Sequence, residues 1–565
     1  MEANGASAAD PSLSRVAGPP LADEPGLGVL TLPGFLRDVT ERHSTREALV
    51  LHEGDVETRW SYRDLWERSM SVARALRACG IGKDERVGVL MTNRPEWISS
   101  VFGASMAGAV PAGVSTFSTP AELEYLLQVS GVSVLLFERS IAKKDFLDIL
   151  LELDPSIATA APGKLQSEKF PFLRRLVVFG EGKEKGAIES WETFIAHGES
   201  EPRAMIEATA AATNPSDCGL LLFSSGSTNK PKAIMNAHRG VAIQLWRWRR
   251  LFGLEGDVRC WAANGLFWSG NFGMMLCVLG VGGTLVLQKT FNAQEALELM
   301  QREKVNFPIA WPHQWPQLEA APNWASADLS AMRYVDARFA VAQHPSVRAP
   351  VWYDPPAYGN TETFTISASY PASTPVEERA GASGPPLNGN AFKIIDPITG
   401  ETTPRGERGE ICVKGPTLML GYLGTPLSET LDDEGFFRTG DGGYLDADGR
   451  LYWEGRLTDI IKTGGANVSP LEVDETIAEI PGVKMTQTVG VPHETLGELV
   501  VTCIVPHEGV ALDAGEVRKF ALERLASYKA PRHVLFFEES ELALTGSNKI
   551  KTSDLKKLVA RRLQA

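Results

Sequence analysis

Short apolar segments alternate with helix-like segments along most of this chain, beginning near residue 45. The segments "RVGVLM", "SVLLF" and "LRRLVVF" have the length and composition of buried strands, whereas "YRDLWERSMSVARALRACG" repeats its apolar residues at helical spacing. Strands that alternate with helices are typical of an α/β fold with largely parallel sheets. No internal repeat and no sustained heptad pattern competes with this interpretation.

The length of 565 residues predicts more than one domain, because a single hydrophobic core stops growing well below this size. After Gly443, the segment "YLDADGRLYWEGR" predicts a hairpin that turns at Asp448 and Gly449. The segment "SPLEVDETIAEI" predicts a helix with Ser469 as N-cap and Pro470 at its first position. This change of pattern indicates a domain boundary close to residue 457.

We therefore expect three regions along the chain. Residues 1–28 lack the basic start and apolar run of a signal peptide, so they are interpreted as a disordered tail. Residues 29–457 are expected to form a large N-terminal domain. Residues 458–565 are of a size to form a small C-terminal domain of their own.

Composition excludes several classes of function. The formal net charge of -14 argues against a protein that binds the backbone of nucleic acids. The six cysteines form neither a CxxC pair nor a disulfide framework, which favours reduced thiols in a cytoplasmic protein. The longest apolar stretch, residues 273–288, is shorter than a bilayer span and is interrupted by glycines, so we expect a buried helix and strand there and no integral membrane association.

A polar loop, "SSGSTNKPKA", follows the strand-like run "DCGLLLF" and precedes the helix-like segment "VAIQLWRWRRLF". Loops at strand ends bind ligands in open α/β sheets, and hydroxyls, backbone N–H groups and lysines can surround a polyphosphate. The loop lacks the Walker pattern GxxxxGK[ST]. A polar surface connection has the same composition, so the loop alone leaves both interpretations open.

This loop and four later segments, which follow in a fixed order, resemble the adenylate-forming superfamily of acyl-CoA synthetases, firefly luciferase and peptide-synthetase adenylation domains. The loop resembles [ST]SGTTGxPKG, with Asn229 and Ala233 where the family favours glycine. The resemblance implies that the loop binds the phosphates of ATP through six positions. These are Ser224, Ser225, Gly226, Ser227, Thr228 and Lys232.

The second segment, "AYGNTETF", resembles the YGxTE motif, in which Gly359 and Asn360 belong to the ATP-binding stretch. The resemblance implies that Tyr358 packs against adenine, that Thr361 contacts phosphate and that Glu362 binds Mg²⁺. Carboxylate and phosphate oxygens are the ligands that this cation prefers.

The third and fourth segments extend the nucleotide site. "FFRTGDGGY" carries the RTGD motif, so Asp441 would accept hydrogen bonds from the ribose hydroxyls. "GRLTDIIKTGGANVSPLEVDE" resembles GRxxDxIKxxGxxIxPxEIE, which implies that Arg456 contacts ribose or phosphate and that Thr458 lies at an interdomain hinge. Gly464 and Gly465 would let the pantetheine arm of CoA pass close to the backbone.

The fifth segment, "LTGSNKIKTSDLKK", resembles TxSGKIxR, with Asn548 in place of glycine. Lys549 would be the catalytic lysine, acting in adenylation together with Thr361 and Glu362. The resemblance implies a large domain of parallel-rich sheets flanked by helices with a β-barrel-like subdomain, and a small mobile α+β C-terminal domain. Rotation of that domain about the hinge would serve the two half-reactions in turn.

The acyl pocket is the least informative part of the sequence. Trp268 stands where amino-acid-activating relatives keep an aspartate, which disfavours an α-amino acid substrate. Gly270 and Gly273 would leave room for an acyl group, whereas Trp311 and Trp315, at helical spacing, are expected in the core. These features suggest an apolar acid and leave medium-chain fatty, aryl and alicyclic acids open.

The expected activity is an ATP- and Mg²⁺-dependent acid:CoA ligase, with CoA as cosubstrate. Two alternatives stay open: an acyl-adenylate synthetase that delivers to a carrier-protein thiol, an amine or another acceptor, and a non-catalytic nucleotide or acyl binder. Residues 336–340 are assigned to the turn that frames adenine. His238 is expected to cap the helix that follows it, with phosphate binding as the alternative. The assembly state is left open, with a homodimer as one alternative.

Overall fold

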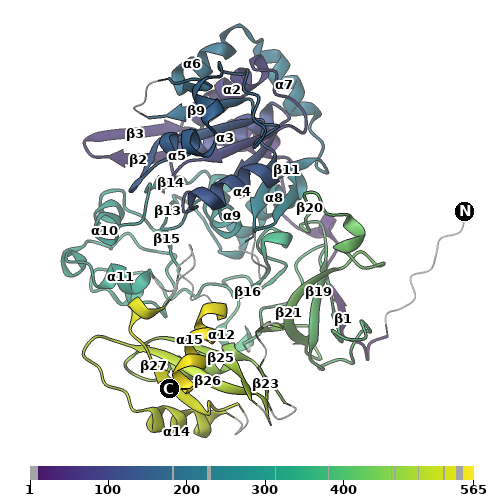
Figure 1. Cartoon of the computed structure of the whole chain (residues 1–565), viewed down its shortest axis with the longest axis vertical. Coiled ribbons are helices and arrows are strands. Elements are labelled where there is room, and N and C mark those ends of the chain that lie inside the picture. Colours follow the sequence, from purple (N-terminus) through teal and green to yellow (C-terminus); the bar gives the residue numbers. More distant parts are fainter. Residues whose placement is uncertain are drawn as a thin grey trace, which may run out of the picture. The chain divides into compact units, whose positions relative to one another are not determined.

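The computed structural model describes residues 10–180, 184–224, 231–311, 314–379, 381–457, 459, 461–463, 466–493, 496–525, 529–542 and 552–564 (Figure 1). The chain divides into two compact units. The first contains residues 17–391 and 414–437, and the second contains residues 1–16, 392–413 and 438–565. The predicted boundary between residues 457 and 458 lies within the second unit and stays a prediction.

An eight-stranded sheet forms the centre of the first unit. Its strands run in parallel from β10 to β11, and β12 and β20 extend it in antiparallel fashion. In spatial order the strands are β10 (Ile188–Ser190), β9 (Arg175–Phe179), β6 (Val134–Glu138), β4 (Arg86–Leu90), β5 (Val110–Gly113), β11 (Cys218–Phe223), β12 (Ala233–Ala237) and β20 (Gly421–Tyr422). The three apolar runs that predicted parallel strands are β4, β6 and β9, as expected.

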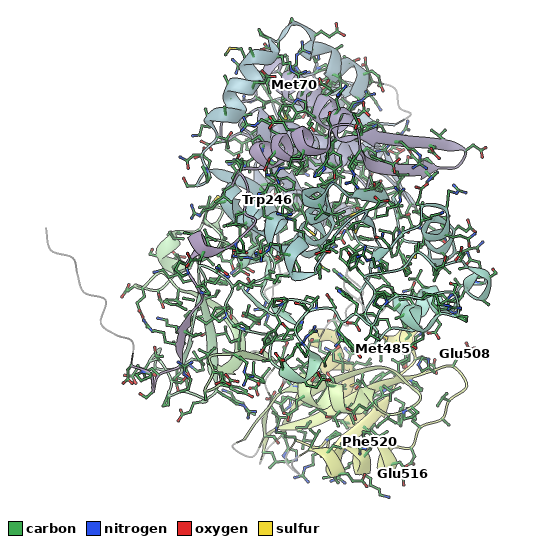
Figure 2. The ribbon with its side chains drawn as sticks, turned by 180° about the vertical axis from the view of Figure 1, so that it is seen from behind. Met70, Trp246, Met485, Glu508, Glu516 and Phe520 are labelled. Carbon is green, nitrogen blue, oxygen red and sulfur yellow. The ribbon has the colours of Figure 1, made fainter. Side chains whose placement is uncertain are left out.

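Helices cover both faces of this sheet. Along β6, Leu136 packs in one core cluster with residues of α2 (Tyr62–Ala78) and α3 (Pro95–Met106). The next residue, Phe137, packs in another with residues of α4 (Pro120–Ser130) and α5 (Phe146–Leu153). Alternate side chains of a strand point to opposite faces, so a sheet buried on both sides needs continuous apolar strands such as these. Trp246 of α8, labelled in Figure 2, is fully buried in the first of these clusters.

A second sheet of five strands completes the first unit. Its order is β15 (Phe307–Ile309), β13 (Arg259–Ala262), β14 (Thr284–Leu287), β2 (Glu47–Glu53) and β3 (Val56–Ser61). All neighbours are parallel except β2 and β3, which form a hairpin. Two short pairs are β16 (Ala357–Tyr358) with β17 (Ala368–Ser369), and β7 (Ser140–Ile141) with β8 (Lys144–Asp145).

The helices of the first unit begin mostly at residues that suit helix starts. Ser61 and Asp64 form a capping box at α2, so the helix predicted from "YRDLWERSMSVARALRACG" is confirmed. The helices are α1 (Leu32–His43), α2 (Tyr62–Ala78), α3 (Pro95–Met106), α4 (Pro120–Ser130), α5 (Phe146–Leu153), α6 (Trp191–His197), α7 (Arg203–Ala212), α8 (His238–Leu251), α9 (Ser269–Leu276), α10 (Ala293–Arg302), α11 (Trp315–Glu319) and α12 (Val376–Arg379).

The longest apolar stretch, residues 273–288, forms the end of α9, a 3₁₀ turn over Cys277–Val281 and the buried strand β14. The expected helix followed by a strand is therefore confirmed. Among the described residues, no helix has both the length and the apolar character that crossing a membrane requires.

The second unit contains two sheets. The first has the order β1 (Arg15–Ala17), β18 (Ala391–Ile395), β19 (Gly409–Lys414), β21 (Phe437–Leu445) and β22 (Leu451–Arg456). Strands β21 and β22 form the predicted hairpin, and Gly449 in its turn has a φ of 78°. The second sheet contains β24 (Ala466–Val468), β23 (Ile461–Thr463), β26 (Gly497–Pro506), β25 (Val483–His493) and β27 (His533–Phe536).

Among the described residues of the second unit, the α+β part contains the helices α13 (Pro470–Ala478), α14 (Ala514–Arg524) and α15 (Thr552–Gln564). Ser469 caps α13 by accepting a hydrogen bond from the backbone N–H of Glu472, with Pro470 at the first helical position. The predicted helix and its cap are confirmed.

The prediction of a disordered tail over residues 1–28 is wrong for residues 10–28. The backbone N–H of Ser14 donates to the carbonyl of Thr403 at 2.8 Å, its hydroxyl donates to the carbonyl of Pro404 at 2.7 Å, and its side chain is fully buried. Strand β1 follows at the edge of a sheet. An edge strand is stabilised by backbone hydrogen bonds, which do not require apolar side chains. The polar composition of this segment therefore did not predict strand β1. Residues 1–9 lie outside the described residues.

Candidate functional site

The polar loop "SSGSTNKPKA" joins β11 to β12, and Phe223 lies opposite Ala233 in this antiparallel pair. At its base, the backbone N–H of Ser224 donates to the carbonyl of Lys232 at 3.1 Å, and the N–H of Lys232 donates to Oγ of Ser224 at 3.3 Å. The predicted phosphate-binding positions Ser225, Gly226, Ser227 and Thr228 lie outside the described residues. The loop is therefore the connection of a hairpin, and β12, which precedes α8, is a strand that sequence analysis missed.

Lys232, at the end of this loop, lies above an aromatic ring. Its Nζ is 4.5 Å from the ring centroid of Tyr422 on β20, and the hydroxyl of Tyr422 donates a 2.8 Å hydrogen bond to Oε1 of Glu362. Tyr422 thus connects a predicted phosphate ligand with the predicted Mg²⁺ ligand. Pairing of β12 with β20, which sets Ile234 opposite Tyr422, produces this contact.

Glu362 fits the chemistry of a hard cation. Its side chain is half-buried, its carboxylate accepts one hydrogen bond from the phenol of Tyr422, and no lysine or arginine of the described chain forms an ion pair with it. A carboxylate that is partly removed from water and not neutralised by a protein cation attracts a metal ion that also binds phosphate oxygens.

The segment around Glu362 is held in a strained conformation. Thr361 and Glu362 lie in a 3₁₀ turn over Thr361–Thr363, for which Asn360 is the N-cap, its side chain accepting from the N–H of Thr363 at 3.0 Å. The two residues after the turn, Phe364 and Thr365, have positive φ values of 45° and 85°. Such conformations cost free energy for residues other than glycine, and they persist only where surrounding contacts hold them.

Helix α8 supplies those contacts. The indole Nε1 of Trp248 donates to Oγ1 of Thr365 at 3.0 Å, and the amide of Gln244 donates to the carbonyl of Ile366 at 2.6 Å. Both side chains are buried. Sequence analysis did not assign a role to either residue, because their partners are distant in the sequence.

Two predicted positions immediately precede the turn. Tyr358 is buried, and its carbonyl accepts from the N–H of Ser367 at 2.7 Å. A Cβ atom on Gly359 would lie 1.7 Å from the carbonyl oxygen of Thr365, so only glycine fits there. The close approach of two backbone segments therefore requires glycine at this motif position.

Of the predicted acyl-pocket residues, Trp268 and Gly270 lie near Thr361. Ser269, between them, donates from Oγ to Oγ1 of Thr361 at 3.5 Å. A Cβ atom on Gly270 would meet nothing within 4 Å, whereas one on the buried Gly273 would lie 3.3 Å from side-chain atoms of Thr365 and Trp248. The room expected at Gly273 is therefore filled by helix packing, and that part of the prediction is corrected.

The two tryptophans expected in the core have different surroundings. Trp315 is buried and stacks on Phe339 at 4.9 Å, as expected. Trp311 is only half-buried, and its ring centroid lies 6.2 Å from that of Trp268. Helix α11 starts at Trp315, so helical spacing does not relate the two residues.

In the second unit, Asp441 and Arg456 face each other across β21 and β22. Nε of Arg456 lies 3.0 Å from Oδ1 of Asp441, and its Nη1 donates to the carbonyl of Thr439 at 2.7 Å. The carboxylate of Asp441 is nearly buried, whereas the guanidinium reaches solvent. The structure therefore brings two predicted nucleotide ligands together as an ion pair.

Several predicted residues fall outside the described residues: the catalytic Lys549, the hinge residue Thr458 and the pantetheine-channel residues Gly464 and Gly465. Their roles remain predictions.

The segment assigned to the adenine turn contains a buried ion pair. The carboxylate of Asp336 binds the guanidinium of Arg338 at 2.6 Å and accepts a hydrogen bond from the N–H of Asp354 at 2.8 Å. Its place beside adenine stays a prediction.

The expectation that His238 caps its own helix is wrong. Its Nδ1 accepts from the N–H of Leu32 at 3.3 Å, so it satisfies a donor at the start of α1, and burial lowers its pKa to about 4.

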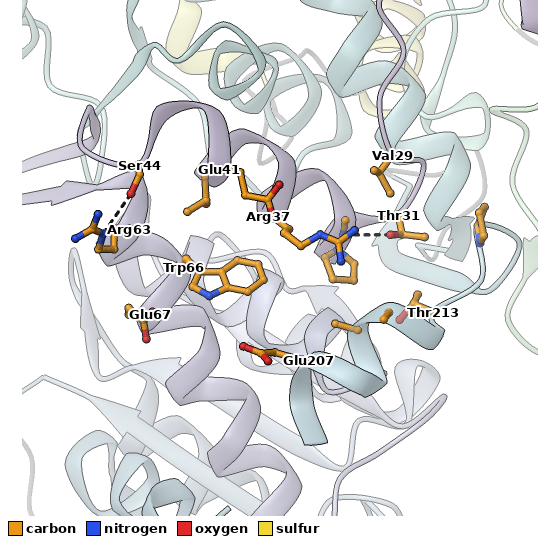
Figure 3. A pocket seen from close by; sticks show the side chains of 16 residues that line it. Val29, Thr31, Arg37, Glu41, Ser44, Arg63, Trp66, Glu67, Glu207 and Thr213 are labelled. Atoms are coloured by element: carbon orange, nitrogen blue, oxygen red, sulfur yellow. Dashed lines mark hydrogen bonds between the residues drawn. The ribbon is translucent and has the colours of Figure 1, made fainter. Parts of the chain in front are cut away.

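A hollow of about 750 Å³ lies elsewhere in the first unit, between α1, α2 and α7. Figure 3 shows the indole of Trp66, from α2, beneath Arg37 of α1. Two of its acidic side chains, Glu67 and Glu207, are paired with Arg203. It contains none of the predicted site residues.

One group of potential metal ligands, His52, Glu57 and Glu303, has ligand atoms within 4.8 Å of one another. Arg59 forms ion pairs with both carboxylates, and Arg259 forms a second one with Glu303. These guanidinium groups already neutralise the acids, so the group is an ion-pair network and not a metal centre.

Two family models match most of the chain. A family model described as AMP-binding enzyme matches residues 36–423, and one described as AMP-binding enzyme C-terminal domain matches residues 472–549. The two models cover most of the chain and include the loop, the Glu362 segment and Lys549.

The chain is similar to curated ligases with different acids in their names. It is 30% identical to a feruloyl-CoA synthase of Amycolatopsis sp over 91% of this chain and 96% of that protein. It is 28% identical to a mitochondrial medium-chain acyl-CoA ligase of Mus musculus over 92% of this chain and 86% of that protein. Among solved structures, an anthranilate CoA ligase in complex with anthranoyl-AMP superposes with a TM-score of 0.78 at 26% identity, covering 96% of this chain and 99% of that chain.

Proposed function

The chain belongs to the AMP-binding enzyme family and is an AMP-forming acid–CoA ligase, and we propose that it acts on a carboxylic acid with an apolar body, using ATP with Mg²⁺. The observation that carries the proposal is that Lys232, at the end of the serine-rich loop, lies over the ring of Tyr422 while Glu362 accepts a hydrogen bond from the hydroxyl of the same residue.

Joining a carboxylate to a thiol requires an activated leaving group. A carboxylate oxygen attacks the α-phosphorus of ATP, and the bond to pyrophosphate breaks. The thiolate of CoA then attacks the acyl carbon, and AMP leaves with the electrons of the C–O bond. Phosphoryl transfer of this kind depends on positioning and charge stabilisation more than on covalent help from the protein.

The residues of the first unit suit that task. Lys232 would bind a phosphate as a point charge held over the Tyr422 ring, and Glu362 would hold Mg²⁺, which neutralises charge on the phosphates. Thr361 lies between Glu362 and Ser269, where a phosphate and the acyl group would meet. The strained turn fixes both side chains before substrate arrives.

In the second unit, Asp441 would accept hydrogen bonds from the ribose hydroxyls, with Arg456 orienting its carboxylate. Lys549 would stabilise the α-phosphate in the first half-reaction. Gly464 and Gly465 would admit the pantetheine arm in the second, after rotation about the hinge at Thr458.

The substrate proposal rests on Trp268 and its surroundings. Trp268 is an uncharged indole beside the rings of Phe267 and Trp311, so an α-ammonium group would find only cation–π contacts there. Open space at Gly270 accommodates an apolar group.

Pyrophosphate release tests the proposal. The purified chain is incubated with ATP, Mg²⁺ and a panel of carboxylic acids, with and without CoA. We expect release with an apolar acid and thioester only when CoA is present. Release without thioester would favour another acceptor, and absence of release with every acid would favour a binding protein.

A variant separates the two half-reactions. Lys549→Ala should abolish pyrophosphate release yet retain thioester formation from preformed acyl-adenylate. Equal loss of both steps would contradict the proposed domain rotation.

A further inference from the structure

Four aromatic side chains form a continuous series beside the candidate site, which we call the aromatic cluster: Phe117, Phe267, Trp268 and Trp311. Successive ring centroids lie 5.8, 5.3 and 6.2 Å apart, and the ring planes are inclined by 70°, 45° and 53°. Inclined rings at these separations have the geometry that aromatic pairs prefer.

The aromatic cluster gathers at strand ends. Phe117 follows β5, Phe267 and Trp268 follow β13, and Trp311 follows β15 by two residues. Parallel strands β13 and β15 are neighbours, and the N–H of Ala263 donates to the carbonyl of Ile309 at 2.9 Å just before their chains diverge. Carboxyl ends of parallel strands are where ligands bind in such sheets.

The position of the loop that carries Phe117 is fixed from outside the cluster. Nζ of Lys144 donates to the carbonyl oxygens of Thr116, Phe117 and Ser118 at 3.3, 2.8 and 2.8 Å. Three hydrogen bonds from one ammonium group hold three successive residues, so the exposed ring of Phe117 is presented by an ordered loop.

Three of the four rings lie outside a closed core. Phe117 is 55% exposed and Trp268 and Trp311 are half-buried, whereas Phe267 is 5% exposed, like the core residue Trp315 at 7%. Gly270, two residues after Trp268, has open space at its Cβ position. Large, partly exposed rings around open space, at the carboxyl ends of parallel strands, indicate a surface that binds a ligand.

A hydrogen bond connects this surface to the residues predicted to bind phosphate and Mg²⁺. Ser269, next to Trp268, donates to Thr361, and Thr361 precedes the predicted Mg²⁺ ligand Glu362. An acid whose body lies on the rings would therefore have its carboxylate directed to the phosphate side of the site.

We propose that the aromatic cluster selects an aryl carboxylic acid, with its ring laid over Gly270 against Trp268 and Trp311. This inference rests on the proposed ligase function and narrows its substrate class. Rigid rings make edge and face contacts with the cluster and lose little conformational freedom on binding, whereas a saturated chain loses rotamer freedom and gains no ring contact. Trp311 is a specificity residue that no motif assigned.

Three acids with nine carbon atoms each make the test: 3-phenylpropanoate, 3-cyclohexylpropanoate and nonanoate. Pyrophosphate release is measured at saturating ATP, and kcat/KM is compared. We expect 3-phenylpropanoate to exceed both saturated acids by about tenfold or more. A preference for nonanoate or the cyclohexyl acid overturns the aryl proposal and leaves the ligase function intact, whereas no release with any acid contradicts the ligase function itself.

Substitutions in the aromatic cluster test whether it causes the preference for 3-phenylpropanoate. Trp268→Leu and Trp311→Leu should each lower kcat/KM for 3-phenylpropanoate by about fivefold or more, bring the phenyl-to-cyclohexyl ratio close to one and leave the KM for ATP unchanged. Trp311→Phe, which keeps a ring, should restore most of the ratio. Trp453→Leu, which removes an exposed tryptophan of β22, is the matched control.

Retention of the wild-type ratio in both leucine variants overturns the assignment to these residues. Thermal unfolding of each variant separates loss of fold from loss of selectivity, and the ratio of two substrates measured on one preparation is independent of the fraction folded.

Discussion

The hydroxyl of Tyr422 donates to the carboxylate of Glu362 at 2.8 Å, although the two residues belong to segments that no sequence motif connects. The same ring carries Nζ of Lys232 over its face at 4.5 Å. Tyr422 therefore holds the predicted cation ligand and the predicted phosphate ligand at a fixed separation, which makes it a positioning residue for the proposed adenylation.

Replacing this hydroxyl should weaken metal binding. Tyr422→Phe keeps the ring under Lys232 and removes one hydrogen bond to a charged acceptor, an interaction worth about 1.5–3 kcal/mol. We expect the Mg²⁺ concentration for half-maximal pyrophosphate release to rise about tenfold, with little change in the KM for the acid. An unchanged Mg²⁺ response would contradict this role.

Lys232 should act through its charge on ATP. Lys232→Met should raise the KM for ATP about tenfold or more, whereas Lys232→Arg, which keeps the cation over the Tyr422 ring, should have a smaller effect. Lys414→Met is the matched control, because Lys414 also lies over an aromatic ring, that of Phe436 at 5.8 Å. Equal effects of the Lys232 and Lys414 variants on ATP would refute the assignment.

The two motif glycines near the site should respond differently to alanine. Gly359→Ala places a Cβ atom 1.7 Å from the carbonyl oxygen of Thr365, so the strained turn must move. Overpacking of this kind costs about 1–3 kcal/mol of unfolding free energy. Gly270→Ala meets nothing within 4 Å and should cause no loss of stability. Chemical denaturation of both variants measures the difference, and a stable Gly359→Ala protein with normal adenylation would contradict the close approach.

Asp441 should determine nucleotide affinity. Asp441→Asn keeps the shape of the side chain but removes the charge that Arg456 holds at 3.0 Å and that would accept the ribose hydroxyls. We expect about a tenfold rise in the KM for ATP and little change in the KM for the acid. Glu454→Gln, which alters an acid of the same hairpin paired with Arg408 at 2.7 Å, should change the KM for ATP less than twofold.

His238 should make the stability of the first unit depend on pH. Burial lowers its pKa from 6.5 to about 4, so between these pH values the unfolded chain binds a proton that the folded chain does not. The stabilisation that uncharged His238 contributes should therefore be fully present above pH 6.5 and be lost as the pH drops towards 4. This loss lowers the free energy of unfolding by about 3 kcal/mol.

His238→Asn offers Oδ1 to the N–H of Leu32 and does not titrate, so it isolates this effect. Denaturation at several pH values should show a smaller fall for the variant than for the wild type. Parallel pH profiles would contradict the assignment.

Local patterns predicted much of the fold because they depend on neighbours in the chain. Continuous apolar runs identified β4, β6, β9 and β11, and Ser469 with Pro470 identified the start of α13. The prediction was wrong where pairing with distant segments decides the outcome. Arg15–Ala17 is a strand because it pairs with β18 at the edge of a sheet whose other strands are distant in sequence. Ala233–Ala237 is a strand because it pairs with β11 on one side and β20 on the other.

The same distinction applies to the site. Motif resemblance selected Lys232, Thr361, Glu362, Asp441 and Arg456, and the structure shows Asp441 paired with Arg456. It could not select Tyr422, Trp248 or Gln244, since each of them acts through hydrogen bonds to residues far along the chain.

The sequence by itself determined the class of chemistry through the order of its motifs: five short segments match one family in a fixed order, and that resemblance implies phosphate, metal and ribose binding. Only the tertiary structure decided which side chains contact the motif residues and which rings lie beside the proposed acyl site. Trp311 was expected in the core, and it lies beside Trp268 because β13 and β15 end side by side. The contacts of a side chain depend on strand order, and strand order is a property of the whole sheet.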